Sequence, residues 1–334
     1  MNESSKVLYI ATDSRLHQPP DWFYEAFVRD GLTLVQGDCW ANEADNAVLA
    51  PNARAMLVGS GRYPVTSESL GRLASCGLIV RMGAGYDTVD VAEATRRGVM
   101  VANMPANIPE EVSDHAIALF LTCLRRLVPQ TVALRSGNWE PYYAYPALRL
   151  RGQTLGLVGC GRIARKVVAK MVGFGLTCIA YDPYTSAAEV ADLGIELVDF
   201  EALLSRADVI SLHAPATAET RELFNAEAFA RMKPSAILIN TARGALVDEQ
   251  ALVTALQTGQ IRAAGLDVFA EEPLKPDNPL LQLDNVVLTP HVASYSEDGL
   301  VDYFQAGHRL ISEFVLDGKV PDSLVNPDVL QVAS

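Results

Sequence analysis

The chain has 334 residues, of which 49% are apolar and 20% charged, and its formal net charge is -13 at pH 7. A chain of this length is longer than a single domain with one hydrophobic core usually is, so we expect two domains. The acidic surface argues against nucleic-acid partners, and the apolar runs are shorter than the about 18 residues that a membrane span needs.

Short apolar runs rich in β-branched residues recur along the first part of the chain, at 7–12, 32–37, 55–60, 78–83 and 99–104. Because these runs are continuous rather than alternating, they predict strands that are buried on both faces of a parallel sheet. Helices are predicted between and after them, at 69–75, at 89–98 and at about 110–127.

The segment 136–153 is rich in aromatic residues and proline and has no helical or strand period, so we interpret it as an extended arm. Seven further strands are predicted after it, at 155–159, 177–182, 195–199, 209–215, 236–242, 265–269 and 286–291, before a last helix at about 297–316. Strands that alternate with helices indicate the α/β fold class, here with two doubly wound parallel-sheet domains.

The first strand of this second series leads into the loop Gly159-Cys160-Gly161-Arg162-Ile163-Ala164, which a helical segment follows. The small residues match the dinucleotide-binding fingerprint in the form that ends in alanine. Gly159 permits the tight turn, Gly161 lets the backbone approach a pyrophosphate, and Ala164 lets the helix pack closely on the strand. The helix N-terminus then presents its N–H groups to the phosphates.

Asp182 ends the next strand, about 20 residues after the loop, where the fingerprint calls for an acidic residue. A carboxylate there binds the hydroxyl groups of the adenosine ribose and repels a 2′-phosphate, so the sequence favours NAD over NADP. The alternative is that Asp182 only caps a turn before Pro183.

Three later stretches bring polar side chains to predicted strand ends: Arg243, the group Asp267, Glu271 and Glu272, and His291. Cofactor domains of this kind build their sites at that edge of the sheet. A guanidinium grips a planar carboxylate, and an imidazole, with an ordinary pKa of about 6.5, exchanges protons near neutrality. The five cysteines are scattered and form no Cys-x-x-Cys pair, so we expect no disulfide framework, no metal site and a cytoplasmic protein. The N-terminal MNESSKVLYI also lacks the pattern of a secretory signal.

With these motifs the chain resembles the D-2-hydroxyacid dehydrogenase family, in particular its phosphoglycerate dehydrogenase and C-terminal-binding-protein branches. The motifs are GLVGCGRIA, YDP, LHAPATAET, INTARGALVDE, GLDVFAEEP and TPHVA. The resemblance implies a Rossmann cofactor domain and a flavodoxin-like substrate domain with the active site in their cleft. It implies a discontinuous substrate-binding domain, 1–106 plus 296–334, and an NAD-binding domain, 107–295, with a dimerisation arm at about 130–152.

The resemblance also implies site residues. Arg243 binds the substrate carboxylate, His291 is the acid/base, and Glu272 is its carboxylate partner, with Glu271 as the competitor. The cofactor residues that it implies are Gly159, Gly161, Arg162, Ile163, Asp182, Ala214, Pro215, Thr241, Ala242 and Asp267.

In the first domain, RMGAGYD matches the family's carboxylate-binding loop, whose N–H groups at Ala84 and Gly85 take the anionic end of the substrate. Arg62 matches a position that faces the substrate in some members, and the alternative is a solvated loop arginine. We interpret His115 as helix packing and His213 as a structural histidine.

The activity that the resemblance implies is NAD-dependent hydride transfer between the nicotinamide and C2 of a small D-2-hydroxyacid or 2-oxoacid, of the glyoxylate, hydroxypyruvate or phosphoglycerate type. Two alternatives stay open: an NAD(H)-sensing protein like the corepressors, and a related dehydrogenase of a non-carboxylate anion such as phosphite. We expect a homodimer with a small anionic substrate and no nucleic-acid or membrane partner.

Overall fold

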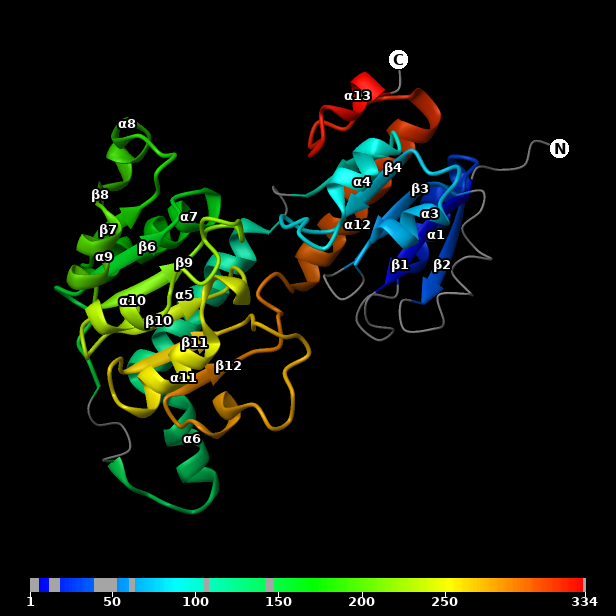
Figure 1. Ribbon diagram of the computed structural model, residues 1–334. Coiled ribbons are helices and arrows are strands. Elements are labelled where there is room, and N and C mark those ends of the chain that lie inside the picture. The colour runs from blue at the N-terminus through cyan, green and yellow to red at the C-terminus, as the bar shows by residue number, and fades with distance from the viewer. Residues whose placement is uncertain are drawn as a thin grey trace. The chain divides into compact units, whose positions relative to one another are not determined.

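The structure is a computed structural model that describes residues 6–11, 19–38, 53–59, 64–104, 108–141 and 147–332. The chain forms two compact units, shown in Figure 1: a first unit of Met1–Ile108 with Ser296–Ser334, and a second unit of Pro109–Tyr295. The chain therefore passes from one unit to the other twice, after Ile108 and after Tyr295.

The sheet of the first unit has five parallel strands in the order β2-β1-β3-β4-β5. This is the flavodoxin-like order. The strands are β1 (Lys6–Ala11), β2 (Thr33–Asp38), β3 (Ala53–Val58), β4 (Leu78–Arg81) and β5 (Met100–Ala102). Each overlaps one of the predicted runs. The inner strand β4 is buried at every position, as a strand covered on both faces should be, whereas the edge strand β2 is partly exposed.

Helices cover both faces of the first sheet. The helices are α1 (Asp21–Arg29), α3 (Ser67–Gly71), α4 (Val91–Arg96), α12 (Glu297–Asp317) and α13 (Val329–Val332). Residues of α3 and α4 pack with Met56 and Ile79 on one face. On α1 and α12, the rings of Phe23 and Phe304 lie 4.8 Å apart, so the helix from the second chain segment completes the core.

The sheet of the second unit has seven strands, all parallel, in the order β12-β11-β10-β9-β6-β7-β8. Counted from β6, this is the Rossmann order with one more strand, so the predicted fold class is confirmed for both units. The strands are β6 (Thr154–Val158), β7 (Thr177–Tyr181), β8 (Ile195–Leu197), β9 (Val209–Leu212), β10 (Ile237–Asn240), β11 (Ala263–Leu266) and β12 (Val286–Leu288).

Two cores lie on the two faces of this second sheet. Helices α5 (Pro109–Arg125) and α7 (Arg162–Met171) cover one face, and α9 (Phe200–Arg206), α10 (Ala226–Arg231) and α11 (Glu249–Gln257) cover the other. Phe224 and Phe229 are fully buried in the latter core, where each contributes about 1.5–3 kcal/mol. The short elements are α8 (Ala187–Val190), η2 (Val172–Phe174), η3 (Ala191–Leu193), η4 (Gly244–Leu246) and η5 (Pro279–Gln282).

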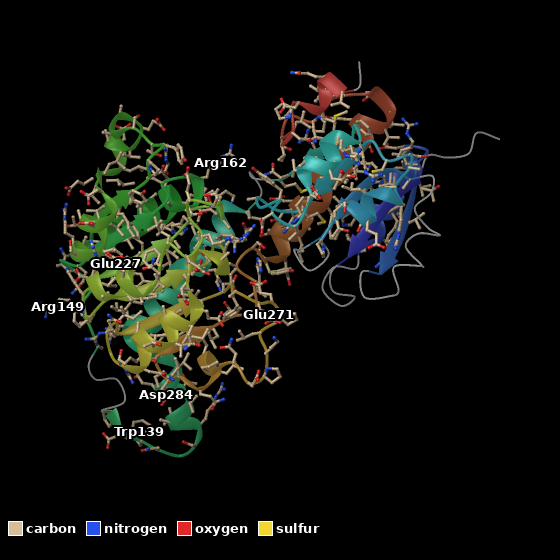
Figure 2. All side chains as sticks on the ribbon, in the orientation of Figure 1. Trp139, Arg149, Arg162, Glu227, Glu271 and Asp284 are labelled. Atoms are coloured by element: carbon tan, nitrogen blue, oxygen red, sulfur yellow. The ribbon has the colours of Figure 1, made fainter. Side chains whose placement is uncertain are left out.

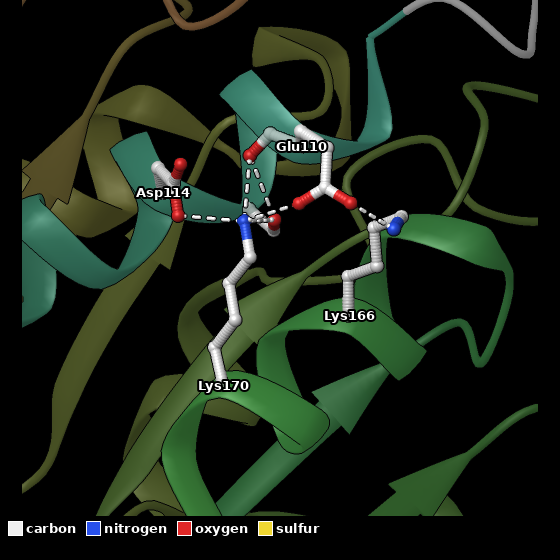
Figure 3. A network of polar contacts seen from close by, with 5 residues as sticks. Glu110, Asp114, Lys166 and Lys170 are labelled. Atoms are coloured by element: carbon white, nitrogen blue, oxygen red, sulfur yellow. Dashed lines mark hydrogen bonds and ion pairs between the residues drawn. The ribbon is translucent and has the colours of Figure 1, made fainter.

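Charged side chains join α5 to α7, as Figure 3 shows. Lys170 Nζ lies 2.6 Å from Asp114 Oδ1 and 2.8 Å from Glu110 Oε2, and Lys166 pairs with the same glutamate. These bonds lower the pKa of Glu110 to about 2. The start of α5, next to the first crossing between the units, is thus attached to the helix that follows the glycine loop.

The predicted arm at about 130–152 begins differently from the prediction. Arg126 has φ 52°, which ends α5 and redirects the chain into a separate helix, α6 (Leu127–Arg135). Residues 142–146 lie outside the described residues. Among the described helices, none alone combines the length and apolarity of a membrane span; the pair α5 and α6, bent by 64°, reaches them together by length and composition only.

Candidate active site

All seven strands of the second unit are parallel, so the loops at their carboxyl ends meet at one edge of the sheet. The glycine loop follows β6, Asp182 follows β7, and Ala214 and Pro215 follow β9. Thr241, Ala242 and Arg243 follow β10, Asp267 follows β11, and His291 follows β12. The fold therefore collects the predicted cofactor and catalytic residues of the second unit at this edge.

The glycine loop has the shape that a pyrophosphate requires. Gly159 has φ +85°, and a Cβ there would lie 2.9 Å from the backbone nitrogen of Ala214. Gly161 forms the N-cap of α7 without a side-chain cap, and a Cβ there would meet no atom within 4 Å. Within the described residues, no side chain of the N-cap bonds the first N–H groups of α7, and Arg162 extends outward in Figure 2. These residues fit a dinucleotide.

The Asp182 carboxylate accepts hydrogen bonds from the glycine loop and from the turn after β7. Its Oδ2 accepts a hydrogen bond from Cys160 N–H at 2.7 Å, and its Oδ1 accepts one from Tyr184 N–H at 2.9 Å. The second bond is the turn cap that the sequence left as an alternative. A carboxylate has about four acceptor sites, so two remain for the ribose hydroxyl groups.

The residues that follow β9 and β10 differ in polarity. Ala214 is buried, and desolvation lowers the pKa of the neighbouring His213 to about 4, so this histidine is neutral. Its ring Nε2 lies 2.9 Å from Ser211 Oγ. Thr241 is buried, and within the described part of the chain its hydroxyl oxygen has no hydrogen-bond partner. An unsatisfied buried hydroxyl at the end of β10 is suited to a polar ligand group, as the carboxamide of a nicotinamide provides.

His291 and Glu272 form the pair that the motifs predict. Nδ1 of His291 lies 2.7 Å from Oε2 of Glu272, and Oε1 of Glu272 accepts a hydrogen bond from Phe269 N–H at 3.0 Å. The competing Glu271 instead pairs with Lys275 at 2.7 Å and lies on the outside of the unit in Figure 2. Of the two glutamates, only Glu272 therefore contacts the imidazole.

The charge of this pair is set by its surroundings. Burial works to raise the pKa of Glu272, but the hydrogen bond and charge of His291 outweigh it, helped by the Arg243 guanidinium, so the pKa lies below its ordinary value. The stabilisation from this carboxylate is therefore present above the ordinary glutamate pKa and is lost as the pH falls through the lowered value.

Gly244, the residue after Arg243, packs against the turn that carries Glu272. A Cβ on Gly244 would lie 1.9 Å from the carbonyl oxygen of Phe269, so the two backbones are in direct contact there. Arg243 itself bonds the carbonyl of Ala242 at 2.6 Å through NH1. The loop after β10 and the turn that carries Glu272 thus form one packed surface.

Asp267 is fully buried, and its carboxylate bonds groups of the chain itself. It accepts hydrogen bonds from Thr289 Oγ1 at 2.5 Å, Val292 N–H at 2.9 Å and Ala293 N–H at 2.8 Å. The role of Asp267 as a cofactor-binding residue, implied by the resemblance, stays a prediction. Thr289 was not singled out from the sequence, and His115, interpreted as helix packing, bonds the Thr289 hydroxyl at 2.9 Å.

The remaining predicted residues belong to the first unit. Ala84 and Gly85 lie in the loop after β4, and within the described residues their N–H groups have no acceptor, as the predicted anion loop requires. Gly83, with φ +144°, would place a Cβ 2.5 Å from the Arg81 guanidinium. Arg62 lies outside the described residues.

Comparison with known proteins assigns the family. The family model of the NAD-binding domain of D-isomer specific 2-hydroxyacid dehydrogenases matches residues 117–293. The chain is 44% identical over 299 residues to a D-3-phosphoglycerate dehydrogenase of Mycobacterium leprae, covering 87% of this chain and 56% of that protein. It is 40% identical to a glyoxylate reductase of Korarchaeum cryptofilum, covering 80% of this chain and 82% of that protein.

A solved structure agrees with this assignment. The D-lactate dehydrogenase of Aquifex aeolicus, complexed with NAD and lactic acid, superposes with a TM-score of 0.83 at 29% identity, covering 96% of this chain and 98% of that one. The chain thus spans little more than half of the mycobacterial relative and nearly all of the lactate enzyme. With its matched NAD-binding domain and its two parallel-sheet units, the chain belongs to the D-isomer-specific 2-hydroxyacid dehydrogenase family.

Proposed function

We propose that the protein is an NAD-dependent D-2-hydroxyacid dehydrogenase that acts on small 2-oxoacids or D-2-hydroxyacids of the glyoxylate, hydroxypyruvate or phosphoglycerate type. The observation that carries this proposal is the 2.7 Å contact between His291 Nδ1 and Glu272 Oε2, within range of the Arg243 charge. The two relatives described above, a D-3-phosphoglycerate dehydrogenase and a glyoxylate reductase, support the substrate range.

NAD, when bound, supplies the hydride acceptor or donor for the C2 carbon. Glu272 holds Nδ1 of His291, so Nε2 is the nitrogen that exchanges a proton with the C2 oxygen. In reduction this nitrogen gives the proton to the developing alkoxide, and in oxidation it takes the proton back. Arg243 binds the substrate carboxylate with its planar fork and stabilises negative charge at the C2 oxygen.

The test is a screen of NADH oxidation with the full chain over glyoxylate, hydroxypyruvate, pyruvate, phenylpyruvate and 2-oxoglutarate. In the oxidative direction, 3-phosphoglycerate and phosphite are each assayed with NAD⁺. Turnover of at least one 2-oxoacid supports the proposal. Binding of NADH without turnover of any acid would favour the NAD(H)-sensing alternative, and turnover of phosphite alone would favour the non-carboxylate alternative.

The charge of Asp182 predicts which cofactor is used. We expect a higher kcat/KM with NADH than with NADPH, and we expect Asp182→Asn to reduce this preference by about 10-fold or more, because the substitution removes a negative charge from the 2′-phosphate position. The amide oxygen keeps one acceptor for the loop. Asp192→Asn, at an exposed position in η3, is the matched control. Equal use of both cofactors by the unmodified protein would contradict the role of Asp182.

We propose that the protein is a homodimer that pairs through α6. Val132 on α6 is 61% exposed, and Trp139 beyond its end is 82% exposed and points outward in Figure 2. An apolar surface of this kind favours a protein partner. Sedimentation equilibrium should give a dimer, and Val132→Glu should shift it toward monomer. Val172→Glu, at an equally apolar exposed position on η2, should leave the dimer intact; a monomeric unmodified chain would contradict the proposal.

A further inference from the structure

A chain of polar groups lies behind the loop that carries His291. His115 of α5 has its Nε2 atom 2.9 Å from Oγ1 of Thr289, and that oxygen lies 2.5 Å from Oδ1 of Asp267. Asp267 is fully buried, and His115 Nε2 also lies 3.5 Å from the same Oδ1 atom. Three elements that are distant in sequence thus converge on one buried carboxylate.

The hydrogen bonds of this group have one consistent direction. Asp267 accepts from the N–H groups of Val292 and Ala293 as well as from the Thr289 hydroxyl. A hydroxyl has one hydrogen, and Thr289 donates it to Asp267, so toward His115 its oxygen acts as an acceptor. His115 Nε2 therefore carries a hydrogen and donates it, which polarises the Thr289 hydroxyl toward the carboxylate.

The carboxylate in turn fixes the backbone that presents His291. His291 has φ 56°, a left-handed conformation that is uncommon for a residue with a Cβ. Its N–H donates to the carbonyl oxygen of Asp267 at 2.8 Å, and the next two N–H groups bond the Asp267 carboxylate. Asp267 therefore determines the orientation of three consecutive peptide groups, beginning with that of His291.

We propose that Thr289 and His115 are positioning residues. Thr289 bonds Asp267, and His115 bonds Thr289, and together they hold the turn in which the His291 imidazole reaches Glu272. The proposal rests on the proposed dehydrogenase function for its kinetic effects, but the geometry that it describes does not depend on turnover. Neither residue contacts the imidazole itself in the described structure. Their effect passes through Asp267 and the backbone of residues 291–293.

The first test is a set of variants that remove one bond at a time. Thr289→Val removes the hydroxyl at nearly constant volume and should lower kcat by about 10- to 100-fold, as a shifted catalytic group does, with little change in the Kd for NADH. Thr289→Ser retains the hydroxyl and should recover most of kcat. Thr254→Val, whose hydroxyl bonds only a carbonyl within α11, is the matched control and should leave kcat unchanged.

The second test asks whether His115 acts through Thr289. His115→Leu should lower kcat less than Thr289→Val, and His115→Gln, which restores a donor, should recover activity. The double variant His115→Leu/Thr289→Val should be no slower than Thr289→Val alone, because both changes break the same chain of bonds. Independent, multiplying losses would overturn the role of His115. Since its side chain is 22% exposed, His115→Leu remains informative if Thr289→Val fails to fold.

A spectroscopic measurement separates this proposal from the proposed function. The imidazole Nδ1–H of His291, bonded to Glu272, is followed by ¹⁵N-edited NMR and assigned by its loss in His291→Asn. Thr289→Val should shift or broaden this resonance, and Thr289→Ser should not, whether or not any 2-oxoacid is turned over. An unchanged resonance together with an unchanged kcat in folded Thr289→Val would overturn the positioning role.

Discussion

His291→Asn is expected to lower kcat for 2-oxoacid reduction by about 10²- to 10⁴-fold, the range typical of a lost general acid. Asparagine is chosen because it tolerates the left-handed φ of 56° at this position better than alanine does, so the turn is retained. The amide supplies no proton at the C2 oxygen, so reduction slows at the proton-transfer step. Stopped-flow measurement of NADH oxidation at saturating 2-oxoacid determines the loss.

The same variant should bind NADH with a Kd within about two-fold of the original, because only the catalytic step is removed. Fluorescence titration of NADH measures this. Glu271→Gln is the control for the local region, since Glu271 is one residue from Glu272 but pairs with Lys275. A kcat that is nearly unchanged in His291→Asn would remove His291 from the mechanism, and equal losses of kcat and NADH binding would indicate misfolding.

Gly244→Ala is expected to be the second most damaging single change. An added Cβ would lie 1.9 Å from the carbonyl oxygen of Phe269 and 2.0 Å from its carbonyl carbon, where only backbone movement can relieve the clash. The movement separates Arg243 from the turn that carries Glu272. We therefore expect kcat/KM to fall by about 100-fold or more, with a loss of about 1–3 kcal/mol in the free energy of unfolding.

Gly173→Ala provides the comparison, because a Cβ there meets no atom within 4 Å and the residue precedes the amino end of β7, whereas the site loops follow the carboxyl ends of the strands. Urea denaturation and steady-state kinetics on both variants separate the two effects. If Gly244→Ala kept the kcat/KM and the unfolding midpoint of the original chain, the packing of the β10 loop on the Glu272 turn would be irrelevant to the reaction.

The strands and the positions of the site loops could be predicted from the sequence because their signals are local. A strand that is buried on both faces is apolar throughout. The glycine loop has residues without a side chain at the two positions that need them, Gly159 for the tight turn and Gly161 for the approach to a pyrophosphate. The break at Arg126, with φ 52°, was not predicted, although Pro129 marks it: a proline has no N–H to bond the carbonyl of Arg125, so the helix cannot continue unbroken. The prediction ended the preceding helix at about residue 127 and assigned no separate helix to the residues of α6.

The partners of individual side chains could be predicted less well from the sequence, because they depend on contacts between residues that lie far apart in the chain. The choice between Glu271 and Glu272 rested on the neighbouring proline, whereas the structure decides it by which carboxylate faces His291. The bonds from His115 to Thr289 and Asp267 join residues far apart in the chain. Nothing in the local pattern of α5 distinguishes a histidine with a polar partner in the loop after β12 from one that only fills space.

The discontinuity of the first unit has a consequence for biosynthesis. Phe23 and Phe27 lie in a core that Phe304 of α12 completes, and the whole second unit, Pro109–Tyr295, is translated in between. At about 5–20 residues per second, this interval lasts on the order of ten seconds or more. The nascent N-terminal segment therefore waits on the ribosome with one apolar sheet face covered by α1 but not yet by α12, while the continuous second unit can fold as it emerges.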